Sequence, residues 1–367
     1  MFGLETGMVL PLLIAVCLMP ALAACAFAEQ SMEVFPKKHW ERRRPSEAGL
    51  NEARLEDFAR FIEAGTDDPA DDRHRRIGCV ARDGYMVHGW GDQNTKLDWF
   101  SSSKPVVSTM LFFAVDAGLL ASVDARIADL GCPLIEKDRQ MTFAHLANQT
   151  SGYVLAEPSG AAYAYNDHAL QLYVLSLEKV FGRSLNEAAM EHFAPLQLED
   201  GDLFNPRRRV VTTPRDFVRI GWFWMHRGCW EGRQVLPKAY FDAYMRPWVP
   251  PDMPRSRTMS NPNDYLGIGS YGGPTGFNQS DMMAGVYGFN WWFNGPIGTT
   301  GVVALRDVPS DLMMALGARG SYMIMLPTER LLVAARGNWG QYDEAEAAKR
   351  ERFNTAMKML MAAIESP

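Results

Sequence analysis

Two strand-like runs around Asp83-Gly84 constrain the fold of this 367-residue chain more than any other feature. Residues 77–82 and 85–90 both read as strands, and an Asp-Gly pair supplies the positive φ angles that a tight hairpin needs. Three more short strand-like runs follow near the other end of the chain, at 312–316, 321–326 and 331–336. Because helical patterns fill much of the sequence between, we expect one α/β (α+β) unit whose sheet is completed by the C-terminal strands.

Seven segments carry a helical pattern. Residues 106–120 are apolar on nearly all sides, so this helix is expected to be buried. Another helix has good start signals, with Thr213 as cap, Pro214 in the first turn and Asp216 near the positive end of the dipole. The predicted helices cover residues 51–65, 106–120, 141–153, 170–181, 214–227, 237–244 and 343–364.

Residues 247–300 are rich in Pro, Gly, Asn and Ser and show little helical or strand period. Such a long irregular stretch in a compact domain is usually functional or disordered. Its many aromatic residues argue against disorder. We therefore expect an ordered loop close to the cleft, within a single catalytic domain over 51–367 that has a mostly helical insertion at about 105–246.

The first 28 residues read as an export signal, because a 16-residue apolar run is short for a membrane span. The run ends in Leu22-Ala23-Ala24-Cys25, which resembles a bacterial lipoprotein cleavage box, and acylation of Cys25 would tether the mature protein to a membrane. A cut after Ala28 would instead release a soluble exported protein. Residues 29–50 read as a leader into the domain, and the remaining cysteines (Cys79, Cys132 and Cys229) as buried free thiols.

The segment Ser101-Ser102-Ser103-Lys104-Pro105 places a serine and a lysine three residues apart just before the buried helix. On one helical turn such residues share a face, with about 5–6 Å between their Cβ atoms. A lysine among apolar groups loses part of its affinity for a proton and can then act as a base toward the serine. Pro105 fits only near the first turn, so Ser101 is expected at the helix start.

Ser-x-x-Lys occurs by chance in a chain of this length, and a second copy runs from Ser176 to Lys179 in the middle of a predicted helix. We interpret that copy as structural. Further segments distinguish the Ser101 copy of the motif from the Ser176 copy. Together with Ser101 to Lys104, they resemble segments of the serine β-lactamase, penicillin-binding protein, D-peptidase and esterase family. The segments occur in the family's order and spacing between about residues 77 and 337. They are Ser101 to Lys104 with Gly118-Leu119-Leu120, then 141–152, Tyr165-Asn166-Asp167, Glu178 to Gly182, and Ala315 to Gly320.

The resemblance implies a β-lactamase/transpeptidase-like fold, an antiparallel sheet flanked by helices with a mostly helical subdomain. It also implies roles for individual residues. Ser101 is the nucleophile that becomes acylated, while Lys104 and Tyr165 move its proton, with Tyr165 either held as phenolate or sharing a proton with the lysine. The backbone N–H groups of Ser101 and Ala318 form the oxyanion hole. The candidate substrate-binding residues are Asp167, His168, Gly317, Trp291 and Trp292.

Two departures from the family pattern bear on the substrate. The tyrosine motif ends in Asp167 instead of Asn, and the late strand motif begins with Ala315, where the family carries a cationic or hydroxyl side chain. The acyl-transfer residues are kept, so we expect a serine hydrolase acting on an ester or a small amide. A D-alanyl-D-alanine peptidase or β-lactamase is the alternative within enzymes. A non-catalytic binding protein for cell-wall fragments is the alternative outside them.

Other classes of function find little support in the sequence. A formal net charge of -6 without a dense basic face disfavours nucleic-acid binding. We expect no metal, because His-Glu-x-x-His and paired cysteines are absent from the sequence. We expect no nucleotide cofactor, because the Gly267-x-Gly269-x-x-Gly272 run lacks a strand before it and a helix after it. The expected partner is a small-molecule ester or amide.

Overall fold

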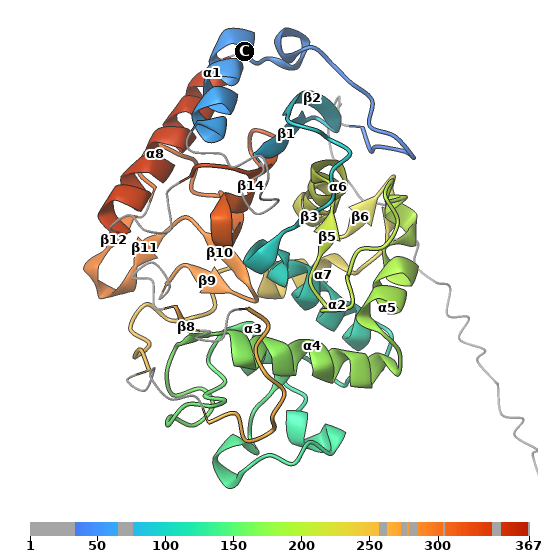
Figure 1. Cartoon of the computed structure of the whole chain (residues 1–367), viewed down its shortest axis with the longest axis vertical. Coiled ribbons are helices and arrows are strands. Elements are labelled where there is room, and N and C mark those ends of the chain that lie inside the picture. Colours follow the sequence, from blue (N-terminus) through green and yellow to red (C-terminus); the bar gives the residue numbers. More distant parts are fainter. Residues whose placement is uncertain are drawn as a thin grey trace, which may run out of the picture.

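The computed structural model describes residues 34–64, 76–256, 263–272, 277–278, 285–303, 305–339 and 346–365. A seven-stranded sheet forms its centre, in the order β2-β1-β15-β14-β13-β10-β9, and every neighbouring pair is antiparallel (Figure 1). The first strands of the chain therefore pair with the last ones, with Ile77 opposite Arg336 in β1 and β15. This arrangement confirms the predicted sheet completed by the C-terminal strands.

The strands of this sheet are β1 (Ile77–Arg82), β2 (Tyr85–Trp90), β9 (Tyr287–Gly288), β10 (Trp291–Phe293), β13 (Met313–Gly317), β14 (Ser321–Leu326) and β15 (Leu331–Arg336). The predicted hairpin joins β1 to β2, and Asp83 and Gly84 have φ angles of 54° and 83°. The two-residue strands form small pairs: β3 (Leu97–Asp98) with β5 (Val211–Thr212), β4 (Tyr165–Asn166) with β8 (Phe277–Asn278), β6 (Cys229–Trp230) with β7 (Arg233–Gln234), and β11 (Pro296–Ile297) with β12 (Val302–Val303).

Helices cover both faces of the sheet because successive strand residues point to opposite sides. On one face, Tyr322 contacts Phe353 of α8 (Glu346–Ala363), and α8 lies beside α1 (Glu52–Glu63). On the other face, Met323 packs against Gly221 of α6 (Pro214–Met225). A Cβ on Gly221 would lie only 2.7 Å from Leu332, so the glycine allows α6 to approach the sheet closely.

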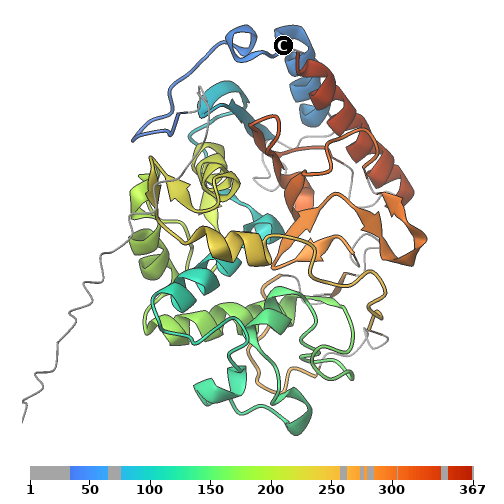
Figure 2. The same cartoon turned by 180° about the vertical axis from the view of Figure 1, so that it is seen from behind.

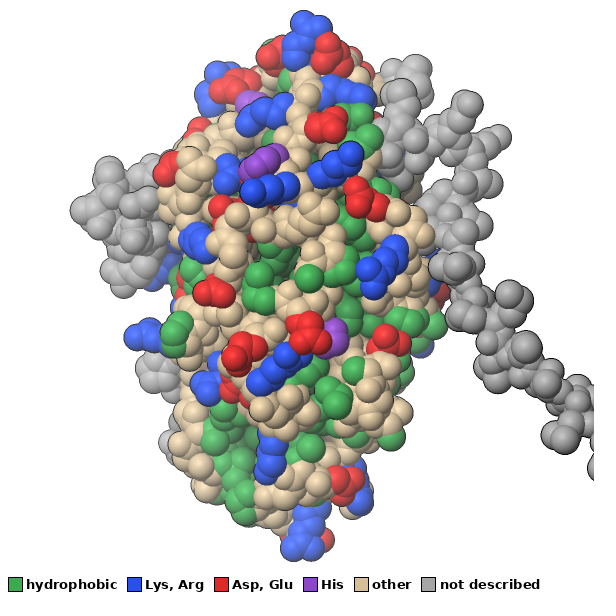
Figure 3. Space-filling view, turned by 90° about the vertical axis from the view of Figure 1, so that its right-hand side faces the viewer, with side chains coloured by type: hydrophobic (Ala, Val, Ile, Leu, Met, Phe, Trp, Pro, Cys, Tyr) green, Lys and Arg blue, Asp and Glu red, His purple; other side chains and the backbone are tan. Residues whose placement is uncertain are grey.

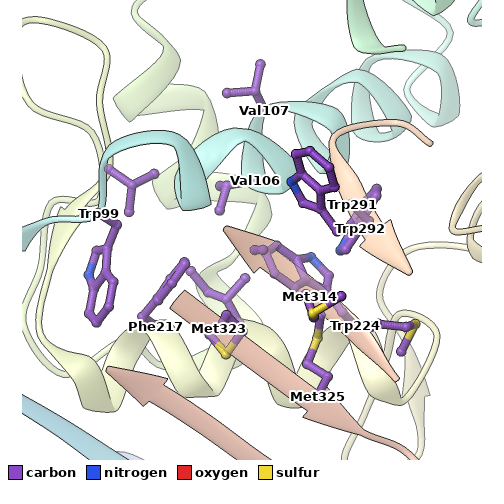
Figure 4. Packing of buried hydrophobic residues seen from close by; sticks show 14 of the residues in the cluster. Trp99, Val106, Val107, Phe217, Trp224, Trp291, Trp292, Met314, Met323 and Met325 are labelled. Carbon is purple, nitrogen blue, oxygen red and sulfur yellow. The ribbon is translucent and has the colours of Figure 1, made fainter. Parts of the chain in front are cut away.

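The remaining helices form the predicted helical part, seen from behind in Figure 2. They are α2 (Lys104–Asp116), α3 (Phe143–Ala147), α4 (Asp167–Phe181), α5 (Leu185–His192) and α7 (Lys238–Tyr244). Helix α2 is buried from Lys104 to Ala114, as its apolar sequence predicts. Trp99, Phe217, Trp224 and Trp291 are among the large side chains packed near α2 and the strands (Figure 4).

Two expectations about secondary structure were wrong, and one helix was not predicted. The segment 141–153 holds only the five-residue α3, because Asn148 leaves helical geometry and Gln149 has a φ of 59°. Helix α5 was missed, although Ser184 and Glu187 form a capping box at its start. The segment 247–300 is not loop throughout, since β9 and β10 within it extend the main sheet.

Residues 34–50 of the expected leader pack against the domain. Trp40 is buried and donates to the Arg215 carbonyl, and Val34 donates to the Asp83 carbonyl. Residues 1–33, including the predicted signal and Cys25, lie outside the described residues. In the part of the chain that the structure describes, no helix combines the length and apolar character needed to cross a bilayer.

Cys79 and Cys132 are free thiols, as predicted, but only Cys79 is also buried as expected. Cys79 is fully buried, which raises its pKa to about 12, and Cys132 is partly exposed. Cys229 is not among the free thiols, so the prediction of a free thiol there is wrong.

Candidate active site

Ser101 lies in a short 3-10 helix, η3 (Phe100–Ser103), that runs directly into α2. Two contacts fix this segment: the Trp99 indole donates to the Thr212 carbonyl at 3.0 Å, and the Ser102 hydroxyl donates to the Trp99 carbonyl at 2.5 Å. Trp99 also stacks on Phe217 at 4.3 Å between ring centroids. The structure thus places Ser101 at the start of a buried helix, as the sequence predicts.

Ser101, Tyr165 and Lys104 form a continuous chain of hydrogen bonds. The Ser101 hydroxyl lies 2.5 Å from the Tyr165 hydroxyl, and Lys104 Nζ donates to that same hydroxyl at 2.7 Å. Lys104 is fully buried, whereas Ser101 is partly exposed. The Lys104 amine is therefore linked to the Ser101 hydroxyl through one phenol, and it is shielded from water.

Burial sets the proton affinities in this chain. Desolvation lowers the pKa of Lys104 to about 7, and the nearby Asp167 carboxylate partly offsets it. Desolvation, together with Asp167, raises the pKa of Tyr165 well above its usual value of 10. The phenolate alternative for Tyr165 therefore finds no support, and the second alternative remains, in which the phenol shares protons between Ser101 and Lys104.

A buried amide network holds Tyr165 in place. Asn166 caps α4 by accepting from the N–H groups of His168 and Ala169, and its Nδ2 donates to the Tyr153 carbonyl at 2.7 Å. The Gln149 side chain accepts from the Asn166 N–H at 2.7 Å. The segment 141–152 thus supports the tyrosine motif.

The end of β13 forms a second wall beside η3. A Cβ built on Gly317 would lie 2.7 Å from the Ser102 nitrogen and 2.8 Å from the Trp99 carbonyl oxygen, so only glycine fits there without displacement. Ala318 follows at the start of η8 (Ala318–Gly320), which contacts η3. This places the Ala318 backbone beside the segment of Ser101, as an oxyanion hole requires. Ala315 is fully buried within β13.

Asp167 and His168 begin α4, immediately after the tyrosine pair. Asp167 Oδ1 is buried without a hydrogen-bond partner among the described residues, and desolvation raises the pKa of this carboxyl to about 6 while Lys104 opposes the shift. His168 faces the segment 263–272, with Nδ1 2.9 Å from the Gly269 carbonyl oxygen. Asp167 therefore belongs to the electrostatic surroundings of Lys104, while His168 anchors the loop.

The structure does not bring Trp291 and Trp292 to the site. Trp291 is fully buried in β10, with its ring centroid 5.4 Å from that of Trp224, and Trp292 packs against Tyr287 at 4.9 Å. These indoles are part of the hydrophobic core (Figure 4), and their assignment as substrate-binding residues stays a prediction that their burial does not support.

Sequence reasoning missed Tyr271 and Asn290. The Tyr271 hydroxyl lies 2.9 Å from the Ser103 hydroxyl, and Asn290 Nδ2 donates to the Ser108 hydroxyl at 2.8 Å. Both come from the long segment 247–300, whose aromatic content was the only signal for a role near the cleft. The described residues 263–272 confirm that this segment reaches the site, since Tyr271 N donates to the Asp167 carbonyl.

The second Ser-x-x-Lys copy does not form a comparable site. Ser176 is buried inside α4 and Lys179 is exposed to solvent. Among the described residues, no group of three or more His, Cys, Asp and Glu side chains is placed to hold a metal ion. On the face in Figure 3, basic and acidic side chains are interspersed with neutral and apolar ones.

Comparison with known proteins gives a family match and several structures with a similar fold. Residues 66–356 match the family model described as Beta-lactamase. A putative beta-lactamase from Bacteroides dorei is similar in structure, with 15% identity, a TM-score of 0.57 and coverage of 79% of this chain and 93% of that one. No curated protein sequence gives a significant match.

Two further solved structures share the fold. A putative 6-aminohexanoate-dimer hydrolase from Bacillus anthracis is 12% identical, with a TM-score of 0.55 over 90% of this chain and 91% of that one. A beta-lactamase/D-alanine carboxypeptidase from Yersinia pestis is 13% identical, with a TM-score of 0.54 over 78% and 93%. With the family model matching most of its length, the chain belongs to the beta-lactamase family, whose fold supports serine-hydrolase chemistry in general.

Proposed function

We propose that this protein hydrolyses an ester or a small amide through an acyl group carried on Ser101. The observation that carries the proposal is the chain from the Ser101 hydroxyl through Tyr165 to the buried Lys104, with links of 2.5 and 2.7 Å. These distances are short enough for direct proton transfer. The lowered pKa of Lys104, about 7, leaves a large share of the amine unprotonated at neutral pH.

The proposed reaction has two halves. As Ser101 Oγ attacks the substrate carbonyl carbon, its proton passes to the Tyr165 oxygen and the phenol proton passes to the Lys104 amine. The N–H groups of Ser101 and Ala318 stabilise the negative carbonyl oxygen, each by about 3 kcal/mol. The alcohol or amine then leaves with a proton returned from the same chain. Water attacks the acyl-serine by the reverse path and releases the acid.

The surroundings of Ala315 support an ester or amide over a β-lactam or D-alanyl peptide. Those substrates carry a carboxylate, and a cationic or hydroxyl side chain is the usual partner for such a group. Here the buried methyl group of Ala315 stands at that position. The β-lactamase and D-peptidase alternative therefore predicts acylation by penicillin, and the proposal predicts poor acylation.

A separation of Lys104 and Tyr165 from Ser101 would have favoured the non-catalytic alternative, and the three side chains instead lie close together. A binding protein that had lost its activity would have no need to keep Lys104 buried beside Tyr165, since burying an ammonium group costs stability. The close approach of the three side chains favours an enzyme.

We also propose that the protein is exported and held at a membrane through Cys25, on the strength of the apolar run and Leu22–Cys25 alone. Fractionation of cells that express the full chain tests this. A membrane-bound parent and a released Cys25→Ala variant are expected, and an equal distribution of the two proteins would contradict the anchor.

Hydrolysis of three chromogenic substrates tests the proposed reaction: a nitrophenyl ester, a nitroanilide and nitrocefin. We expect turnover of the ester or anilide, loss of turnover in Ser101→Ala, and full activity in Ser176→Ala, the matched control for the second motif. Turnover of nitrocefin alone would support the β-lactamase alternative. No turnover and no burst of product with any substrate would support the non-catalytic one.

A further inference from the structure

The residue before the nucleophile has a strained backbone. Phe100 has a φ of 46°, a left-handed conformation that bulky residues rarely adopt. Its own N–H donates to Asp98 Oδ1 at 2.8 Å, and its carbonyl accepts from the Ser103 hydroxyl at 2.5 Å. Strain of this kind persists only where the surroundings impose it, and it occurs often at active sites.

Two arginines surround the Phe100 side chain. The guanidinium carbons of Arg209 and Arg336 lie 5.1 and 5.2 Å from the centroid of its ring, within the range of a cation–π contact. Both arginines also bind Asp98: Arg209 forms an ion pair with the carboxylate, and Arg336 donates to the carbonyl. Each guanidinium therefore contacts both the Phe100 ring and Asp98.

The two arginines come from different parts of the fold. Arg209 precedes β5, which pairs with β3 through Val211 and Asp98. Arg336 ends β15 in the main sheet, is 3% exposed, and donates from Nε to the Ser321 hydroxyl at 3.2 Å. The nucleophile segment is thus tied both to the helical part and to the sheet.

We propose that Asp98, Arg209 and Arg336 form a clamp that keeps Phe100 in its left-handed conformation and thereby aims the hydroxyl and N–H of Ser101. They are positioning residues, since they act on the substrate through Ser101. The effect of the clamp on the reaction rate rests on the proposed function. Its effect on the backbone of Phe100 is independent of any activity.

The rate of phosphonylation of Ser101 by a fluorophosphonate tests the positioning role. Arg209→Ala is expected to lower this rate about tenfold, since small displacements of reacting groups are costly. Arg209→Lys keeps the charge and should recover part of the loss. Arg208→Ala is the matched control, because Arg208 pairs with Glu178 at 2.5 Å instead of with Asp98. With a substrate, the loss should fall on kcat and leave KM unchanged.

A stability comparison tests the clamp without using activity. Ala and Gly at position 100 both remove the ring, but only Gly adopts a positive φ freely. Phe100→Gly should therefore unfold at a higher temperature than Phe100→Ala. In an Arg209→Ala background the backbone can relax, so this advantage of Gly should shrink or reverse.

The two measurements separate the proposals. An unreactive parent protein would contradict the proposed function, while the stability comparison would still decide on the clamp. A Gly advantage that is absent, or that is unchanged after Arg209→Ala, would overturn the clamp. Equal phosphonylation rates for Arg209→Ala and Arg208→Ala would overturn its positioning role even if the backbone result holds.

Discussion

The interior of the sheet and the start of α2 are both buried, yet their chemistry is opposite. All six residues of β15 are buried, and the strand pairs along its whole length with β1 on one side and β14 on the other. At the start of α2, burial covers the amine of Lys104, and Asp167 Oδ1 nearby has no hydrogen-bond partner among the described residues. Phe100 adds a left-handed backbone.

This difference indicates where the molecule gains stability and where it loses it. Apolar burial in the sheet stabilises the fold, while each feature at the nucleophile costs free energy that the rest of the structure must offset. Such local costs are typical of sites that must react. Substitutions in the two regions should therefore move stability and activity in different directions.

The largest effect is expected from Lys104→Met. Hydrolysis should fall by about 10³-fold or more, because the general base is lost. Stability should rise, since the pKa of Lys104 is about 7 in the folded protein against 10.5 unfolded. The cost of burying the protonated amine is fully present below pH 7 and disappears as the pH approaches 10.5. We therefore expect the unfolding free energy of the variant to exceed that of the parent by about 1–3 kcal/mol at pH 6, and by less at pH 9.

Urea unfolding at both pH values, together with steady-state rates, checks this prediction. A variant that is both inactive and less stable at pH 6 would break the contrast between the two regions.

Leu332→Ala tests the other side of the comparison. Leu332 is fully buried in β15 against α6, so its truncation should cost about 2–4 kcal/mol of unfolding free energy. The kcat of the folded fraction should stay within about twofold of the parent, because Leu332 pairs with Ala81 and Met325 in the sheet and faces Gly221 of α6. A large loss of kcat at a temperature where the variant is fully folded would show that the sheet interior does tune the site.

Gly317→Ala probes the border between the regions. Its new methyl group would meet the Ser102 nitrogen and the Trp99 carbonyl at under 3 Å, so η3 must shift. We expect about a tenfold loss in acylation rate with a smaller loss of stability. Gly295→Ala is the control, because its methyl group would find only an ordinary contact at 3.7 Å with Val286. Similar rates for the two variants would contradict the close wall at Ser101.

The last prediction concerns pH and involves no loss of folded protein. With the pKa of Lys104 at about 7, kcat/KM should rise about tenfold between pH 6 and pH 8 as the amine loses its proton. Asp167 holds that pKa up, so Asp167→Asn should move the rise to lower pH. A profile that is flat, or that moves to higher pH in the variant, would exclude Lys104 as the titrating base.

Much of the fold could be predicted because local signals agreed with the tertiary structure. The Asp83-Gly84 turn and the cap at Thr213 act through neighbouring residues and appear where the sequence places them. The capping box from Ser184 to Glu187 was an equally good signal for α5 and was overlooked. The strand of Trp291 was missed because β10 has only three residues, and only one of its two neighbours, β9, is close in sequence, whereas β13 lies about twenty residues further along.

The site was predictable only in part. The positions of Ser101, Lys104 and Tyr165 follow from short motifs in a fixed order, and the structure brings them together. The arginines at Phe100 carry no local signal, because Arg209 and Arg336 are distant in sequence and come from different elements of the fold. Burial was also invisible in sequence, which is why Trp291 was expected at the cleft.

Intact mass spectrometry after incubation with a fluorophosphonate tests the central claim most directly. The protein should gain the mass of one adduct, Ser101→Ala should gain none, and Ser176→Ala should react like the parent. That pattern would establish an activated serine at the start of α2. A folded parent that gains no adduct, or a Ser101→Ala variant that still gains one, would contradict the account.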